Sequence, residues 1–125
     1  CTRKGTIVAD NQKRIPALFY QSESGKQPVR DWLMKLEVAD RKTIGTDVKT
    51  VEFGWPIGIP TCRPKGKGLY EVRSSLSGSR IARVLFCIYN GQMVLLHGFI
   101  KKSQKTPKQE LDIALDRKRK VEASS

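Results

Sequence analysis

The sequence lacks the residues that build metal centres and disulfide frameworks. Its 125 residues include one histidine and three cysteines, and Cys1, Cys62 and Cys87 show no Cys-x-x-Cys spacing and cannot all pair. We therefore expect no metal site, no cofactor and reduced thiols. No apolar segment follows Arg3 and Lys4 as in a signal peptide, and no run approaches the length of a membrane span. These absences predict a single cytoplasmic domain with no membrane partner.

Acidic residues are also scarce. Twelve Asp and Glu stand against 24 Lys and Arg, which gives a net charge of +12. Residues 61–83 carry six basic side chains and one acidic, and residues 101–120 carry eight and three. Such a field attracts polyanions and speeds encounter with them. A solubilising lysine coat is the alternative, but arginines inside strand patterns are poor solubilisers. We therefore expect a nucleic-acid partner.

The chain is organised around residues 79–105, where two apolar runs flank Asn90-Gly91. This pair predicts a β-hairpin with a type I′ turn. Counting outwards from the turn gives the pairs Tyr89–Gln92, Phe86–Leu95, Val84–His97 and Arg83–Gly98. In this register the glycine leaves Arg83 room to reach across the sheet, whereas His97 faces away from Arg83.

The remaining elements predict an α+β domain. A first strand at 15–20 should lie on a sheet edge because Pro16 cannot donate to a ladder. Pro28 should open a short helix and Asp40 should cap a second, ending near Gly54, so that the two form a helical hairpin. Residues 63–68 are interpreted as a basic loop, and 69–74 as a strand.

The C-terminal part completes this prediction. Thr106-Pro107-Lys108-Gln109 has the pattern of a capping box and should begin a helix with Leu111, Ala114, Leu115 and Val121 facing inward. The result is a small, mainly antiparallel sheet with helices packed on one face. We expect an N-terminal extension at 1–13 that could add a short strand, one domain at 14–121, and a frayed tail at 122–125.

Three segments resemble one known family. They are Gly68 to Arg73, Arg80 to Phe86, and Leu95 to Pro107, which contains Phe99-Ile100-Lys101-Lys102-Ser103-Gln104-Lys105-Thr106-Pro107. Together they are similar to the HigB-type, phage-derived branch of the RelE/ParE toxin superfamily, over roughly residues 14–120. The resemblance implies a RelE-like fold and the toxin of a type II toxin–antitoxin pair. Such a toxin would cut mRNA, usually on the ribosome, and would be silenced by a helix-turn-helix, HigA-like antitoxin.

The chemistry of such an enzyme can be compared with the residues present. Metal-free RNA cleavage uses the 2′-OH as nucleophile and needs a proton acceptor, cations around the phosphorane and a donor for the leaving oxygen. The resemblance places Arg73, Arg83 and Lys102 at the phosphate, with the neighbouring Lys101 as the alternative to Lys102. The residues expected to hold the flanking RNA backbone are Lys65, Lys67, Arg80, Lys101 and Lys105. Glu71 and His97 are the candidate acid and base groups.

Each of these assignments has a plainer alternative. Arg73 could form a salt bridge with Glu71, Arg83 could be an outward-facing arginine paired to a nearby acid, and His97 could be a packed strand histidine. The whole chain could instead be a non-enzymatic ParE-like inhibitor of DNA gyrase or a basic nucleic-acid-binding module.

The nuclease hypothesis makes one geometric demand. Arg73 and Arg83 can bind one phosphate only if they share a face of the sheet. A two-residue Ser77-Gly78 turn would put them on opposite faces. The hypothesis therefore predicts a three- or five-residue loop, or a bulge, between Ser74 and Arg80.

Overall fold

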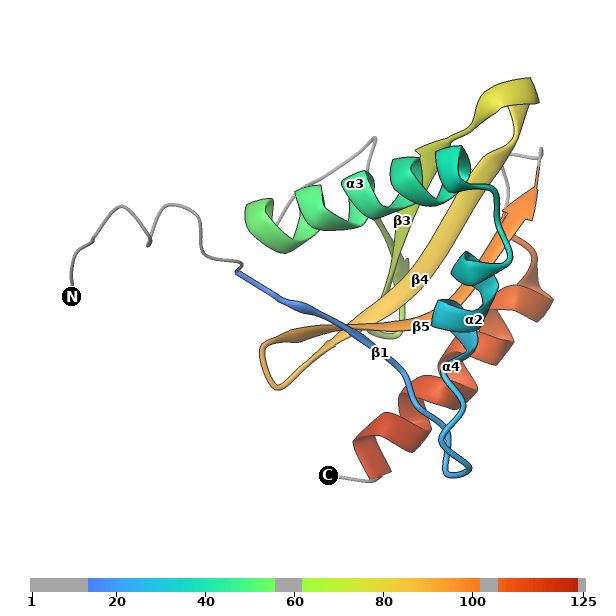
Figure 1. Cartoon of the computed structure of the whole chain (residues 1–125). Coiled ribbons are helices and arrows are strands. Elements are labelled where there is room, and N and C mark those ends of the chain that lie inside the picture. Colours follow the sequence, from blue (N-terminus) through green and yellow to red (C-terminus); the bar gives the residue numbers. More distant parts are fainter. Residues whose placement is uncertain (1–13, 56–61, 102–105, 124–125) are drawn as a thin grey trace.

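The computed structural model describes residues 14–55, 62–101 and 106–123. The elements in chain order are β1 (Ala17–Phe19), α2 (Pro28–Met34), α3 (Val38–Gly54), β2 (Cys62–Gly66), β3 (Leu69–Ser75), the 3-10 turn η1 (Ser77–Ser79), β4 (Ile81–Tyr89), β5 (Gln92–Lys101) and α4 (Lys108–Ala123). This is the predicted α+β class (Figure 1). The predicted extension at 1–13 lies outside the described residues, and α4 runs two residues into the predicted tail. Among the helices described, none has the length and apolar character needed to cross a membrane.

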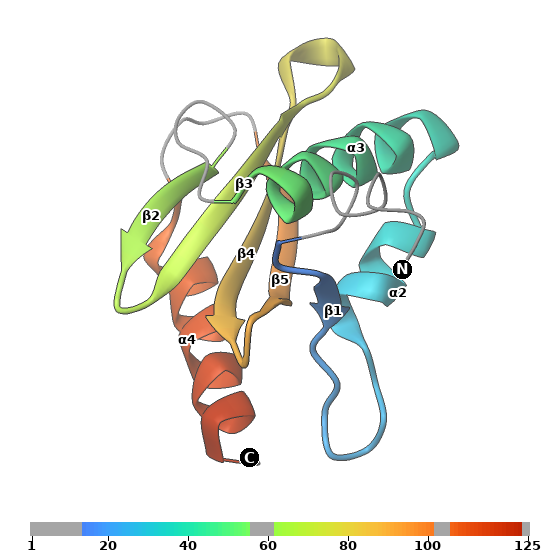
Figure 2. The ribbon, with the colours of Figure 1, turned by 90° about the vertical axis from the view of Figure 1, so that its left-hand side faces the viewer.

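The five strands form one sheet in the order β1-β5-β4-β3-β2 (Figure 2). All neighbours are antiparallel except β1 and β5, which are parallel. β1 lies on an edge, as Pro16 predicted, and the outward backbone N–H of Ala17 donates to Glu52 Oε2 of α3 at 2.5 Å. The interpretation of residues 63–68 as a loop was wrong for 63–66, which belong to β2, whereas 67 and 68 form the turn to β3. β2 forms the second edge, where the sheet tolerates Pro64.

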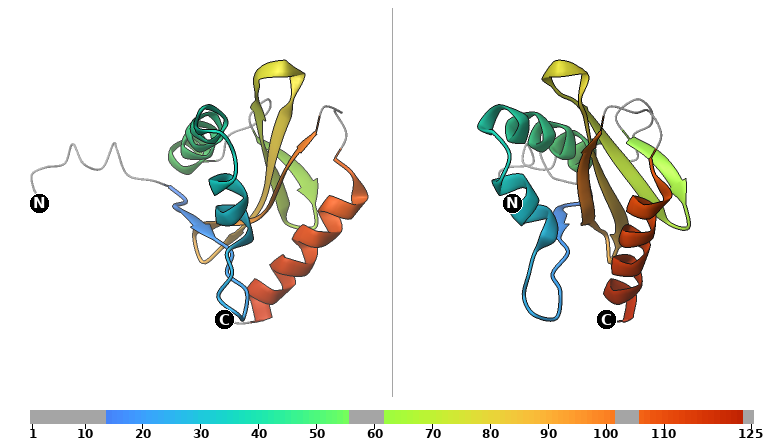
Figure 3. Two further views of the ribbon diagram at one scale, coloured as in Figure 1. Left: turned by 45° about the vertical axis from the view of Figure 1, so that its right-hand side comes forward. Right: turned by 90° about the vertical axis from the view of Figure 1, so that its right-hand side faces the viewer.

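Helices cover both faces of the sheet, so the prediction of helices on one face was wrong. α2 and α3 pack on one face and α4 packs on the other (Figure 3). The reason lies in β4, where Val84 and Phe86 belong to the first core and Leu85 and Cys87 to the second. A strand that is apolar on both faces must be covered on both.

The two predicted helices before β2 are both present. Pro28 is the first residue of α2, and Ile44, Val48 and Val51 of α3 are buried as expected. Their packing against each other as a helical hairpin is not confirmed, because α2 packs mainly on β5 and α3 mainly on β3.

A bulge in β5 changes the predicted register. The pairs Tyr89–Gln92 and Phe86–Leu95 are confirmed. The next pair is Leu85–His97, so Leu96 is an extra residue on β5, and the predicted pairs Val84–His97 and Arg83–Gly98 were wrong. One inserted residue moves every later side chain of β5 to the opposite face. Arg83 therefore lies opposite Phe99, and His97 lies on the same face as Arg83.

The bulge gives Gly98 a different neighbour from the one predicted. Gly98 now faces the α2 side of the sheet, where the Trp32 ring packs directly on it. A Cβ added at Gly98 would lie 2.5 Å from both Cε3 and Cζ3 of Trp32. The glycine therefore makes room for a tryptophan of α2 and not for an arginine of β4.

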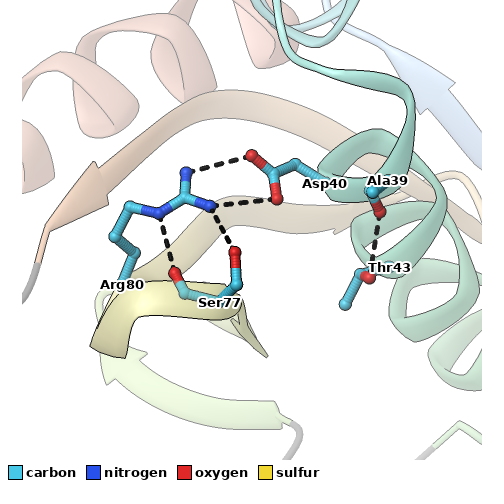
Figure 4. A network of polar contacts seen from close by, with 5 residues as sticks. All are labelled: Ala39, Asp40, Thr43, Ser77 and Arg80. Atoms are coloured by element: carbon cyan, nitrogen blue, oxygen red, sulfur yellow. Dashed lines mark hydrogen bonds and ion pairs between the residues drawn. The ribbon is translucent and has the colours of Figure 1, made fainter.

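An ion pair fixes the connection between β3 and β4 to α3 (Figure 4). Arg80 donates from Nη1 and Nη2 to the two carboxylate oxygens of Asp40, at 3.0 and 3.2 Å. Its Nε also donates to the Ser77 carbonyl at 2.9 Å. The expectation that Asp40 caps the second helix was wrong, because α3 begins at Val38 and Asp40 is buried within its first turn.

Candidate nucleic-acid interface

Arg73 and Arg83 meet on the α4 side of the sheet. They are directly opposite each other in the β3–β4 ladder, whose last pair is Ser75–Ile81. The connection is therefore the five residues 76–80, and the odd loop that the nuclease hypothesis required is confirmed. Because opposite residues of antiparallel strands project to the same side, both guanidinium groups belong to one surface.

Glu71 is the centre of a charged cluster on this face. Its side chain is 0% exposed, and Oε1 accepts a hydrogen bond from Arg73 Nε at 2.8 Å. Lys65 Nζ lies 3.7 Å from the same oxygen, and Thr106 Oγ1 donates to Oε2. The salt bridge considered as an alternative role for Arg73 is thus present. We call Glu71, Lys65, Arg73, Arg83 and Thr106 the Glu71 cluster.

Arg83 lies at the bottom of the Glu71 cluster. It is the largest fully buried side chain in the described residues, with 0% exposure, so the outward-facing alternative was wrong. Burial lowers the pKa of Arg83, the negative charge of Glu71 opposes that effect, and the positive charges of Arg73 and Arg63 add to it. An arginine stays protonated in proteins at neutral pH. The cluster therefore has a buried positive charge beneath its more exposed cations.

Cations outnumber carboxylates around Glu71. Arg63 of β2 is directly opposite Glu71 in the β2–β3 ladder. Lys65 and Arg73 keep 19% and 12% of their side chains exposed. Three arginines and a lysine thus surround this carboxylate, and all of them except Arg83 are partly exposed. An anion that approached this face would meet a net positive charge.

His97 is held by α4. Its Nε2 lies 2.5 Å from Glu110 Oε1, and Nδ1 lies 3.4 Å from Arg117 Nη1, which also donates to the Leu96 carbonyl at 2.8 Å. Because arginine only donates, Nδ1 is assigned as the acceptor and the Nε2 proton points to Glu110. Its ring also stacks on Phe99, with centroids 5.7 Å apart. Both nitrogens are engaged, which favours the packed strand histidine over an acid–base group.

The other predicted RNA contacts are dispersed. Lys101 is exposed opposite Ile81, on the face of Arg83. Lys67 is exposed in the β2–β3 turn, at the far end of β3 from Arg73, and Arg80 is engaged by Asp40. Lys102 and Lys105 lie outside the described residues. Of the four such residues that the structure describes, Lys65 and Lys101 are therefore the two on the face of Arg73 and Arg83.

Two residues close to Glu71 were missed. Arg63 lies in a basic, glycine-punctuated run that indicated a loop, whereas the structure places it in β2. Thr106 was predicted to cap α4, but α4 begins at Lys108, and the Thr106 hydroxyl donates to Glu71, 35 positions away in the chain. No local pattern could have indicated that contact. Within the described ranges, no group of three or more His, Cys, Asp and Glu side chains is placed to hold a metal ion.

Comparison with known proteins gives one family match. Residues 31–119 match the family model described as "Phage derived protein Gp49-like (DUF891)". No curated protein matches the chain. The matched span includes every residue of the Glu71 cluster.

Proposed function

The chain belongs to the Gp49-like family of phage-derived proteins, a family of toxin–antitoxin toxins in the RelE/HigB-like group, and from this premise we propose that it is an mRNA endoribonuclease. It would be the HigB-type toxin of a type II pair. It would use the RNA 2′-OH as nucleophile, without a metal ion, and would act on ribosome-bound mRNA in the cytoplasm.

The observation that carries this proposal is the pairing of Arg73 with Arg83 on one face. In-line attack forms a bond between the 2′-oxygen and phosphorus and breaks the bond from phosphorus to the 5′-oxygen. The negative charge that develops on the phosphorane needs preorganised cations. Arg73 and Lys65 are exposed enough to contact a phosphate, while Arg83 contributes its charge from below, where low dielectric strengthens its effect.

Among the described residues, neither Glu71 nor His97 is available to transfer a proton to or from RNA. Both carboxylate oxygens of Glu71 accept hydrogen bonds, and both ring nitrogens of His97 face partners on α4. A general base must come within hydrogen-bond reach of the hydroxyl it deprotonates. This favours the ribosome-dependent form of the proposal, in which the ribosome positions the RNA for attack.

The antitoxin is the second part of the proposal. A toxin of this family implies an antitoxin partner. We propose a HigA-like, helix-turn-helix protein whose acidic segment lies over the Glu71 cluster, since a chain with a net charge of +12 favours an acidic partner and covering the cations would block phosphate binding. A small helix-turn-helix reading frame beside the coding sequence is the expected genomic sign.

The test is incubation of the purified chain with mRNA in a translating extract, with cuts mapped by primer extension. We expect ribosome-dependent cuts, and at least roughly 10-fold slower cutting by Arg73→Ala, because a lost transition-state donor typically costs more than that. Lys49→Ala, an exposed cation on α3, is the control and should cut normally. Arg73 is preferred to Arg83 because truncation of a fully buried arginine would also disturb the core.

Other outcomes would select the rival functions. Accumulated gyrase–DNA breaks without RNA cuts would indicate a ParE-like inhibitor. RNA binding without either effect would indicate a binding module. Either result would refute the nuclease proposal.

A further inference from the structure

Glu71 cannot act as a proton acceptor in the arrangement described. Its side chain is 0% exposed, so no substrate hydroxyl can come within hydrogen-bond distance of it. Oε1 is occupied by Arg73, and Oε2 is occupied by Thr106. A carboxylate whose two oxygens both accept hydrogen bonds from protein donors stabilises the fold or orients those donors.

The contact with Arg73 is well suited to positioning. Glu71 and Arg73 are two residues apart on β3, so their side chains project from the same face, and Arg73 Nε donates at 2.8 Å. A free arginine side chain has many rotamers, and fixing it on RNA binding costs conformational entropy. An arginine that is already held by a buried carboxylate has lost that freedom before RNA arrives.

Thr106 extends this support to the start of α4. Its hydroxyl donates to Oε2, whereas the backbone donors of Glu110 and Leu111 are satisfied by the Pro107 carbonyl. The hydroxyl proton of Thr106 is therefore committed to Glu71. It links the β3 strand to the segment that follows β5.

We infer that Glu71 and Thr106 are positioning residues of the proposed nuclease, which hold the Arg73 guanidinium ready for an RNA phosphate. This inference rests on the proposed function, and it excludes Glu71 as the general base. It predicts that loss of the Thr106 hydroxyl will disturb the orientation of the Arg73 guanidinium and slow cleavage, although Thr106 itself does not contact RNA.

Two measurements on the full chain test the inference. The first is the NMR signal of the Arg73 Nε–H group, which reports the contact with Glu71 whether or not the chain cuts RNA. The second is the rate of ribosome-dependent cleavage as a function of pH. The variants are Thr106→Val, which removes the hydroxyl at nearly constant shape, Thr106→Ser, which restores it, and Glu71→Gln. Thr50→Val is the matched control, because the Thr50 hydroxyl is exposed on α3 and bonds its own helix.

Thr106→Val should shift the Arg73 signal and slow cleavage about 10-fold, since a small misplacement of a catalytic contact is costly. Thr106→Ser should return the Arg73 signal to its wild-type position and the cleavage rate to within about 3-fold of the wild-type rate. Thr50→Val should change neither the signal nor the rate. Glu71→Gln should be slower than the wild type but keep the same dependence of rate on pH. If Glu71→Gln does not fold, the Thr106 variants decide alone.

The inference is overturned if Thr106→Val leaves the Arg73 signal unchanged, or if Glu71→Gln removes the acid limb of the pH–rate profile, as loss of a general base would. Absence of cleavage by the wild type would instead overturn the proposed function. In that case the NMR measurement still decides, now with titration of a 2′-O-methyl RNA oligonucleotide. RNA should move the Arg73 signal less in Thr106→Val than in the wild type, and an equal response in both would refute the inference.

Discussion

Replacement of Gly98 by alanine should destabilise the protein through a clash with Trp32. The new Cβ would lie 2.5 Å from two ring atoms and 3.1 Å from Cδ2 of a rigid indole, so the ring or the strand must move. Overpacking of this kind costs about 1–3 kcal/mol. An alanine also lowers the conformational entropy of the unfolded chain, which stabilises the folded state by about 0.4–1 kcal/mol. The midpoints of the two ranges give an expected net loss of about 1.3 kcal/mol, with extremes of about 0 and 2.6 kcal/mol, and a fall in Tm of roughly 5 °C for a domain of this size.

The measurement is thermal and urea unfolding followed by circular dichroism. Gly45→Ala is the matched control, because nothing lies within 4 Å of a Cβ at that helical position. It should raise stability by about 0.5–1 kcal/mol. In a double-mutant cycle, Trp32→Leu combined with Gly98→Ala should lose less than the sum of the two single changes, since the clash disappears with the ring.

The outcome discriminates between the two registers of the hairpin. If Gly98 lay opposite Arg83, as simple counting from the turn predicts, an added methyl would not meet Trp32. A Gly98→Ala variant that gains stability as Gly45→Ala does would refute the packing of Trp32 on Gly98, and with it the bulge at Leu96.

Three further outcomes are expected. Arg73→Ala should lower the slope of log affinity against log salt for a 2′-O-methyl RNA by about 0.7, the value for one phosphate contact, whereas Lys49→Ala should not. Arg80→Ala should lower the urea midpoint at low salt, and the deficit should shrink as salt screens the ion pair. Burial raises the pKa of Cys62 and of Cys87 from 9.0 to about 11, so the folded state holds both protons more tightly. Stability should therefore fall as pH rises from about 9 to 11, and a double Cys→Ala variant should flatten that fall in urea unfolding.

The parts of the fold that could be predicted are those set by local chemistry. Asn90-Gly91 gave the turn and the pairs beside it, Pro16 gave an edge strand, and Pro28 gave a helix start. Periodicity predicted the inward face of α4, where Ala114 is buried and Leu111, Leu115 and Val121 pack partly buried against the same core. Each of these depends on residues close in the sequence, whose conformational preferences act without reference to the rest of the chain.

The errors arose where distant packing decides. No residue near Leu96 marks a bulge; Gly98 looks like ordinary strand glycine until Trp32 of α2 is placed on it. The basic, glycine-punctuated run at 63–68 indicates a loop, but residues 63–66 belong to an edge strand, which tolerates Pro64. Asp40 had the residue type of a cap, yet Arg80, forty positions later, determines its contacts.

The candidate site was predictable in part because chemistry imposed a constraint on geometry. Two arginines that share one phosphate must share a face, and that demand predicts the odd loop after β3. The surroundings of Arg73 and Arg83 were not predictable. The burial of Arg83 depends on both sheet neighbours, and the hydroxyl of Thr106 reaches Glu71 across 35 positions.

The two borders of the sheet restrict how another protein can join it. At the β2 edge, Pro64 has no backbone N–H to donate. At the β1 edge, the backbone N–H of Ala17 already donates to the Glu52 carboxylate. A neighbouring chain that tried to extend the sheet by strand addition would find both borders blunted, which also discourages self-assembly into fibrils. A neutralising partner is therefore expected to recognise side chains on a face of this protein and not its backbone.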